Sequence, residues 1–289
     1  MPELPEVQTI VSDLNVKLKG HSVQKIWTDW PKSFHPSVLR VRKGIVGRKV
    51  NGVRRRAKNI LIDFQGDQTL LIHLKMTGHL LYRDHDWKNK ERKDSPFYDS
   101  FNQFIRTCFY LDKNKELAFS DVRRFGEIKL FKTSEENDIP RLKKLGPEPL
   151  SREFKFALFK TRLKNKKGFI KSVLLDQNTI SGIGNIYADE ILWEAKINPK
   201  QKTDSLNTKQ SIAIHKAIVK ILKKAVKYRG TSISDYRDAL GRKGNYQNVR
   251  KVYKRDGLNC YRCKTKLSRT KVNNRGTTYC SKCQKLYVQ

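Results

Sequence analysis

The chain has 289 residues, of which 37% are hydrophobic and 31% are charged. This length is sufficient for two domains, or for one domain with appendages. Lys and Arg number 62 against 28 Asp and Glu, which gives a formal net charge of +34. Such an excess favours a polyanionic partner, most simply nucleic acid, although a generally basic proteome would produce the same balance. No apolar run is long enough to predict a transmembrane helix.

The first residues lack the basic and apolar regions of a secretory signal, so we expect an intracellular protein without assigning a compartment. Apolar residues then recur at helical spacing and predict a long first helix over residues 3–19, ending at Gly20.

Short strand-like runs separated by turns follow this helix and occupy the rest of the first half. They predict an antiparallel β-sandwich with the first helix beside it, hence an α+β fold. The expected strands cover residues 23–27, 49–54, 60–64, 69–74, 104–111, 116–120 and 127–131.

The composition changes near residue 132, where a polar stretch precedes Gly146-Pro147-Glu148-Pro149. We therefore expect an N-terminal domain over 1–132, a linker over 133–150, a helical domain over 151–248 and a cysteine-bearing tail over 249–289. Helices are predicted over 153–163, 170–175, 186–195 and 208–228. Residues 231–247 contain glycines and polar side chains, which predicts an irregular loop.

Four of the five cysteines lie in the tail as two Cys-x2-Cys pairs separated by sixteen residues: Cys260, Cys263, Cys280 and Cys283. This spacing is typical of a structural zinc site in which each pair supplies two thiolates from one turn. Two disulfides or free thiols are the less favoured alternatives. A β-hairpin is expected near residues 271–278, and the tail carries twelve cationic side chains against Asp256 alone, as expected for contacts to phosphate.

Pro2 follows the initiator methionine, whose removal would leave a secondary amine at the N-terminus. An α-amino group titrates near ~7.7 to 8.0, so a useful fraction is nucleophilic at neutral pH. Condensation with an aldehyde carbon would give an iminium ion that acts as an electron sink. Glu3 could move protons at that carbon, and Glu6 could neutralise the amine or stabilise the helix start. Ordinary helix capping by proline and glutamates is the competing interpretation of this segment.

The segment Met1-Pro2-Glu3-Leu4-Pro5-Glu6-Val7, the four-cysteine tail and several internal motifs together resemble the formamidopyrimidine-DNA glycosylase / endonuclease VIII family. The likeness covers essentially the whole chain. It implies an N-terminal β-sandwich, then a helical domain with a helix-two-turn-helix motif and a zinc finger, with DNA in the cleft between the two. A monomer is also implied.

The resemblance implies a bifunctional DNA glycosylase and abasic-site (AP) lyase of base excision repair. Pro2 would attack the sugar of a flipped nucleotide and drive β- and δ-elimination, and Glu3 would protonate the ring oxygen. Lys58, after Arg55-Arg56-Ala57, matches the family's β-hairpin lysine. Arg275, before Gly276-Thr277-Thr278-Tyr279-Cys280, matches the arginine that grips the phosphates beside the lesion.

Further positions match DNA-contacting residues of the family. An apolar residue, a cation and an aromatic ring would fill the gap left by the flipped base, although core packing is the alternative. Glu6 and Glu190 match the lesion pocket. The implied DNA contacts are Met76, Asn102, Arg123, Phe125, Lys166 and Asn185, of which Asn102 stands where many relatives have histidine.

The N-terminus and the stretch over 230–247 resemble the formamidopyrimidine branch, which favours formamidopyrimidines and 8-oxoguanine as substrates. The same chemistry on oxidised pyrimidines, hydantoins or single-stranded DNA is an alternative. A more remote alternative is a non-catalytic, zinc-dependent nucleic-acid binder, which explains the charge and the cysteines but gives Pro2, Glu3 and Lys58 no role.

Overall fold

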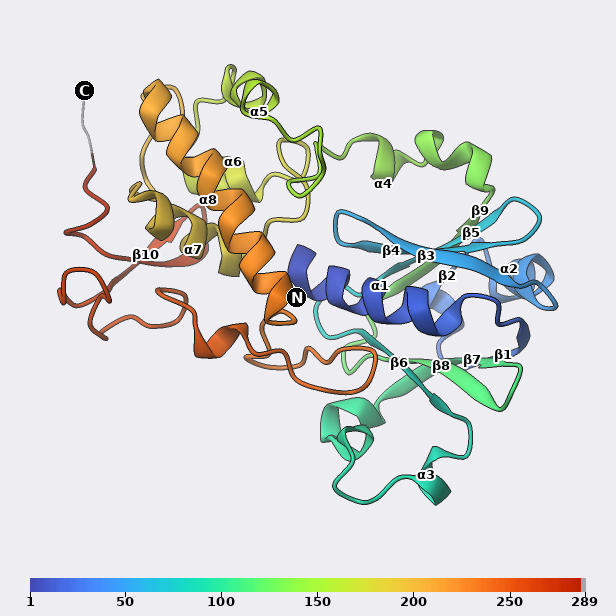
Figure 1. Cartoon of the computed structure of the whole chain (residues 1–289). Helices are drawn as coiled ribbons and strands as arrows, with labels where there is room; N and C mark the ends of the chain where they lie inside the picture. Colours follow the sequence, from blue (N-terminus) through green and yellow to red (C-terminus); the bar gives the residue numbers. More distant parts are fainter. Residues whose placement is uncertain (287–289) are drawn as a thin grey trace. The chain divides into compact units, whose positions relative to one another are not determined.

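The computed structural model describes residues 1–286, which form two compact units (Figure 1). The first unit comprises Met1–Lys143 and Tyr228–Gln247, and the second comprises Lys144–Lys227 and the residues from 248 onward. The chain thus passes between units inside the stretch expected to be a linker. The segment Tyr228–Gln247, which the sequence assigns to the helical domain, packs with the first unit instead.

The first unit begins with helix α1 (Leu4–Leu18), as the periodicity of its apolar residues predicts. Two sheets follow, one ordered β1-β7-β8-β6 and the other β2-β9-β5-β4-β3. All pairings are antiparallel except β2 with β9, a two-residue parallel bridge. The strands are β1 (Val23–Thr28), β2 (Phe34–His35), β3 (Val50–Arg56), β4 (Asn59–Phe64), β5 (Gln68–His73), β6 (His79–Asp84), β7 (Ile105–Leu111), β8 (Lys115–Ser120) and β9 (Glu127–Phe131).

One hydrophobic core joins α1 to both sheets and contains Val7, Ile10, Ile60, Leu80 and Phe119. The expected α+β sandwich is therefore confirmed. Short helices complete the unit: α2 (Val38–Ile45), α3 (Trp87–Lys90), α4 (Pro140–Lys143), and 3-10 turns at Pro31–Ser33, Pro96–Tyr98, Ser100–Gln103 and Thr133–Asp138.

Strand β6 was not predicted, because its residues do not alternate between apolar and polar. Five consecutive residues, from His79 to Arg83, are buried, since both faces of the strand are covered. Leu80 faces the main core, and Leu81 belongs to a second cluster with Trp87 and Phe97 on the other face.

Up to residue 286, the second unit contains four helices, each near its predicted range, and one hairpin. The last of the helices is long and amphipathic and packs on the one before it. Within residues 1–286, no helix combines the length and apolar character needed to cross a membrane. The elements are α5 (Phe156–Leu163), α6 (Ile170–Leu175), α7 (Asn185–Ala195), α8 (Thr208–Lys227), β10 (Ser268–Val272) and β11 (Arg275–Tyr279), and a 3-10 turn at Tyr246–Asn248 contains the point where the chain passes from the first unit back to the second.

Candidate active site

Helix α1 lies antiparallel to strand β3, and this arrangement brings the start of the helix toward the turn that follows the strand. Asn15 accepts a hydrogen bond from the Val53 backbone N–H (2.8 Å), and Gln8 accepts one from Arg55 Nε (2.9 Å). Earlier helix residues therefore lie beside later strand residues. The N-terminal residues of the helix thus point toward the two-residue β3–β4 turn, where Lys58 stands.

The candidate catalytic residues at this end of the unit are buried. Pro2 is buried, Glu3 is 3% exposed and Lys58 is 7% exposed. The Glu6 carboxylate, also buried, accepts the Glu3 backbone N–H at 2.8 Å and so fixes the turn that presents Pro2. A carboxylate in this first helical turn also favours the positive end of the helix dipole.

Two connecting segments of the first unit, between β5 and β6 and between β8 and β9, carry the three residues expected to fill the DNA stack. Met76 and Phe125 are about half-exposed, although large apolar side chains are usually buried. The Arg123 guanidinium lies 4.5 Å from the centre of the Phe125 ring, a cation–π contact. These exposures disfavour core packing, the alternative for Met76 and Phe125.

Asp121, for which the sequence predicted no role, holds these residues together. Its buried carboxylate accepts the backbone N–H groups of Arg123, Phe125 and Gly126, and the hydroxyl of Thr77. Thr77 follows Met76 directly, so one carboxylate joins the two segments that carry the exposed side chains. Its position two residues before Arg123 is the signal that could have identified it, since Asp commonly bonds the backbone two residues on.

In the second unit, hairpin β10–β11 presents Arg275 to solvent. The turn residues Asn273 and Asn274 both have positive φ, as a tight two-residue hairpin turn requires. A buried pair supports the hairpin from the helices: Lys171 Nζ lies 2.6 Å from Asp189 Oδ1 and also donates to Gly276 O and the Thr277 hydroxyl. Burial raises the pKa of Asp189 to about 7, and Lys171 opposes this shift.

The helix-two-turn-helix region meets the same hairpin. Gly182 has a φ of +86°, which favours glycine, and Gly184 caps α7. Asn185, the first residue of α7, donates its amide to Gly276 O at 3.0 Å. The structure therefore joins Asn185 to the residue that follows Arg275, whereas the ammonium group of Lys166 pairs with Asp176 at 3.1 Å.

Two of the expected site residues are placed differently. Glu190 is fully buried, and its carboxylate accepts the backbone N–H groups of Lys251, Val252 and Tyr253, which joins α7 to the tail. Asn102 is also fully buried and donates to Pro96 O and Gly241 O. This geometry argues against a lesion-pocket role for Glu190 and against direct DNA contact by Asn102. It gives both side chains structural roles.

The four tail cysteines are arranged to hold a metal ion. Their sulfur atoms lie within 4.8 Å of one another, with Cys260–Cys283 at 4.0 Å and Cys263–Cys280 at 3.4 Å, and none is in a disulfide. A tetrahedral zinc ion with bonds of ~2.3 Å requires sulfur separations of about 3.8 Å. The set fits one structural zinc ion. Arg262 anchors the module by stacking on Trp193 at 3.7 Å.

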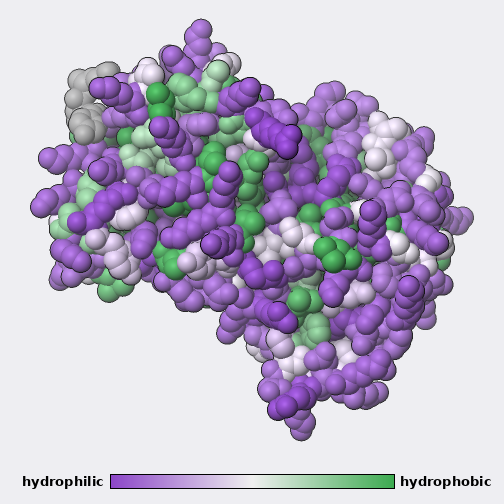
Figure 2. All heavy atoms as spheres, in the orientation of Figure 1, coloured by the Kyte–Doolittle hydropathy of each residue, from purple (hydrophilic) through white to green (hydrophobic). Residues whose placement is uncertain are grey.

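Hydrophilic side chains cover most of the face shown in Figure 2, consistent with the strong net charge. Three family models match the chain. The formamidopyrimidine-DNA glycosylase N-terminal domain matches residues 1–128, its H2TH domain matches 145–237, and a zinc finger found in FPG and IleRS matches 257–286. These matches and the geometry define the class: a zinc-finger DNA glycosylase.

Individual proteins similar to this chain belong to the same family. The formamidopyrimidine-DNA glycosylase of Desulforamulus reducens is 40% identical over 292 residues, covering 99% of each chain. That of Carboxydothermus hydrogenoformans is 40% identical over 286 residues, covering 99% of this chain and all of the relative. Lactococcus lactis Fpg in complex with N7-benzyl-Fapy-dG DNA has a TM-score of 0.87 and 33% identity, over 98% of this chain and 100% of that one. The chain belongs to the formamidopyrimidine-DNA glycosylase family, and is thus a DNA-repair enzyme of a family with AP-lyase activity.

Proposed function

We propose that the chain is a bifunctional glycosylase and AP lyase in which Pro2, freed by removal of Met1, is the nucleophile. The observation that carries this proposal is the antiparallel packing of α1 on β3, which directs the start of the helix toward the Lys58 turn. Capping alone would explain the glutamates, but it would not explain a buried lysine in the turn toward which the helix start is directed.

In the proposed reaction the Pro2 nitrogen attacks C1′ of the damaged nucleotide. The C1′–base bond breaks as the C1′–nitrogen bond forms, and the base leaves with the electron pair of that bond and takes a proton from solvent. Glu3 then gives a proton to the ring oxygen while the proline nitrogen loses its own proton, so that the sugar opens and an iminium ion remains. The resulting iminium ion withdraws electrons, so a C2′ proton leaves and the C3′–oxygen bond breaks; a further elimination breaks the C5′–oxygen bond. The cation of Lys58 stabilises the phosphate that leaves.

Recognition requires the damaged nucleotide to leave the stack, at a cost of a few kcal/mol. Met76, Phe125 and Arg123 are suited to fill the gap, since all three are exposed, the Arg123 guanidinium lies over the Phe125 ring, and Asp121 joins the two segments that carry them. Arg275 contacts the phosphates beside the lesion, with further contacts from Asn185 and Lys166. Glu6 supports the pocket by fixing the turn that presents Pro2.

The proposed substrates are formamidopyrimidines and 8-oxoguanine. Lactococcus lactis Fpg, of the same fold at 32% identity and a TM-score of 0.86, is known in complex with Fapy-dG DNA. A second complex of that protein contains an oxidised pyrimidine. Oxidised pyrimidines are therefore the second candidate substrate class, and hydantoins and single-stranded DNA belong to the same alternative. We also propose that the enzyme acts inside the cell as a monomer.

A panel of oligonucleotides tests the substrate class. Duplexes with 8-oxoguanine, a formamidopyrimidine, an oxidised pyrimidine or a hydantoin, and the matching single strands, are incubated with limiting enzyme. The proposal expects the purine-derived lesions in duplex DNA to have the highest kcat/KM, with phosphate at both cut ends. A preference for pyrimidine lesions or for single strands would transfer the assignment to the second candidate.

A further inference from the structure

The segment Tyr228–Gln247 has almost no regular structure, yet it is fixed at its start to helix α1. The Arg229 guanidinium pairs with Asp13 of the helix and with Asp238 of its own segment, both at 2.5 Å. Two residues later, the Thr231 backbone N–H donates to Glu6 Oε1 at 2.7 Å. The other oxygen of Glu6 holds the Glu3 backbone. The start of the segment and the catalytic turn therefore share one carboxylate.

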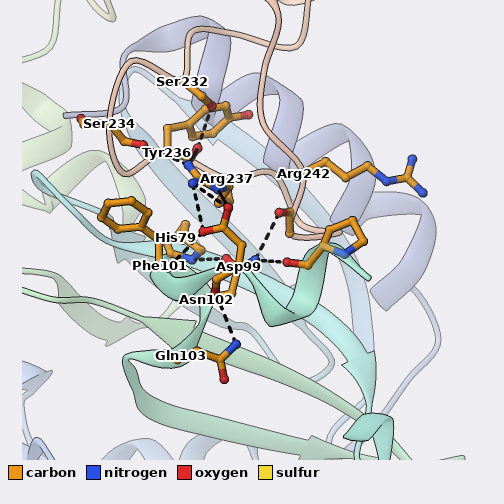
Figure 3. Close-up of polar contacts among 12 residues, drawn as sticks. His79, Asp99, Phe101, Asn102, Gln103, Ser232, Ser234, Tyr236, Arg237 and Arg242 are labelled. Carbon is orange, nitrogen blue, oxygen red and sulfur yellow. Dashed lines mark hydrogen bonds and ion pairs between the residues drawn. The ribbon is translucent and has the colours of Figure 1, made fainter. Parts of the chain in front are cut away.

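A second attachment joins the segment to the 3-10 turns before strand β7 (Figure 3). Arg237 makes a bidentate ion pair with Asp99, with Nη2 at 3.0 and 2.8 Å from the two oxygens and Nε at 3.0 Å. Its remaining nitrogen donates to the carbonyls of Ser234 and Tyr236, each at 2.9 Å. The Arg237 side chain is only 3% exposed. One guanidinium thus fixes both the position and the curvature of the loop.

Asn102 provides a third attachment. Its amide donates to Gly241 O at 3.2 Å and to Pro96 O at 2.7 Å, and its oxygen lies 2.8 Å from His79 Nε2. Gly241 has a φ of +76°, and a Cβ there would lie 2.8 Å from the Asn102 amide nitrogen. The close approach therefore requires glycine at position 241, and the hydrogen bond requires the amide of Asn102.

These attachments leave a short arch over residues 232–235. The residues that anchor it, Thr231 before it and Tyr236 and Arg237 after it, are buried, whereas the four arch residues are not. The Ser232 hydroxyl closes the base of the arch by donating to Tyr236 O at 2.7 Å. The arch therefore depends on the residues beneath it for its shape.

We propose that Arg237, Asp99 and Asn102 are positioning residues that hold this arch ready for the damaged base, so that they set lesion recognition and leave strand cutting unaffected. The inference rests on the proposed function. An arch ordered in the free enzyme does not lose conformational freedom when the base arrives, which strengthens recognition. An abasic site has no base for the arch to contact, so its cleavage does not depend on the arch.

The test compares Asp99→Asn with Asp94→Asn, which makes the same chemical change on an exposed side chain five residues earlier. Single-turnover rates are measured on a duplex with an oxidised purine and on the same duplex with an abasic site. Asp99→Asn should lower base excision about tenfold or more and abasic-site cutting less than about twofold, and Asp94→Asn should change neither. Arg237→Lys should reproduce the defect, because lysine lacks the planar fork.

Hydrogen exchange of the backbone amides over residues 231–236 in the free enzyme gives a second readout. The proposal expects faster exchange in Asp99→Asn than in wild type and no change in Asp94→Asn. Equal losses on both substrates, or unchanged exchange, would overturn it. If the wild-type enzyme excises no damaged base, the proposed function fails, and the exchange rates still decide whether the ion pair orders the arch.

Discussion

Lys171 and Asp189 form an ion pair whose two side chains are 0% and 1% exposed, directly beneath the hairpin that carries Arg275. Removing one charge leaves the other buried without its partner, which costs about 3–5 kcal/mol. Lys171→Met should therefore lower the free energy of unfolding by that amount and weaken DNA binding. Urea denaturation and fluorescence anisotropy measure the two effects.

Two further variants distinguish charge from packing at this site. Lys171→Met combined with Asp189→Leu removes both charges and should recover much of the lost stability. Lys220→Met breaks an exposed pair with Glu194 and should change the unfolding free energy by about 0–1 kcal/mol. Equal stability of the single and double variants would contradict the account of this pair.

The zinc site should support DNA binding through the hairpin. Cys280→Ser removes one of the four cysteine ligands, and a chelator removes the ion itself. Affinity for an abasic-site duplex should fall at least about tenfold, since phosphate contacts by ordered arginines are lost. Cys108→Ser, which changes a cysteine outside the set, should keep both zinc and affinity. Undiminished binding by the metal-free protein would refute this role.

Phe125 should act on DNA and contribute little to the fold. The residue is 49% exposed, so Phe125→Ala should change the unfolding free energy by less than about 1 kcal/mol. Excision from duplex DNA should nevertheless fall about tenfold or more, because refilling the stack offsets the cost of flipping. The control is Val122→Ala in the same turn. A large loss of stability in Phe125→Ala, together with normal excision, would contradict this role and show that Phe125 packs in the core.

Stability should fall in mild acid. Burial lowers the pKa of His79 to about 4 and that of His73 to about 3, against 6.5 in the unfolded chain. Between the folded and unfolded pKa values, the unfolded state binds more protons than the folded state. The stability that these neutral, buried histidines contribute is therefore complete above pH 6.5 and is lost as the pH falls toward 4. Each histidine should contribute about 2 kcal/mol of loss between pH 7 and pH 5. Urea midpoints across this range measure it, and His79→Gln should reduce the slope. A flat profile would contradict the assigned burial.

The sequence predicted the parts of the fold that local patterns specify. The periodicity of α1, the turns between most strands and the cysteine spacing each depend on neighbours in the chain, and each was confirmed. Strand β6 was missed because its burial on both faces depends on Trp87 and Phe97, which come from elsewhere in the fold.

In the candidate site, too, the features set by local sequence were predicted and those set by distant residues were not. The motif around Pro2 and the tail arginine were evident from residue types, although their roles remain predictions. Asp121, and the contact of Arg237 with Asp99, were not found, since the second joins residues 138 positions apart. Asn102 was matched to a DNA contact, but its amide instead donates to the carbonyl of Gly241, in a loop far along the chain.

Borohydride trapping followed by peptide mapping tests the central claim most directly. Wild-type protein, with its N-terminal residue verified by mass spectrometry, is reduced in the presence of an abasic-site duplex and digested. The account predicts a covalent adduct on the peptide that begins with Pro2. In Pro2→Gly, at comparable DNA affinity, this adduct should be absent or form far more slowly. An adduct on a lysine such as Lys58, or no adduct from a protein that verifiably begins with Pro2, would contradict it.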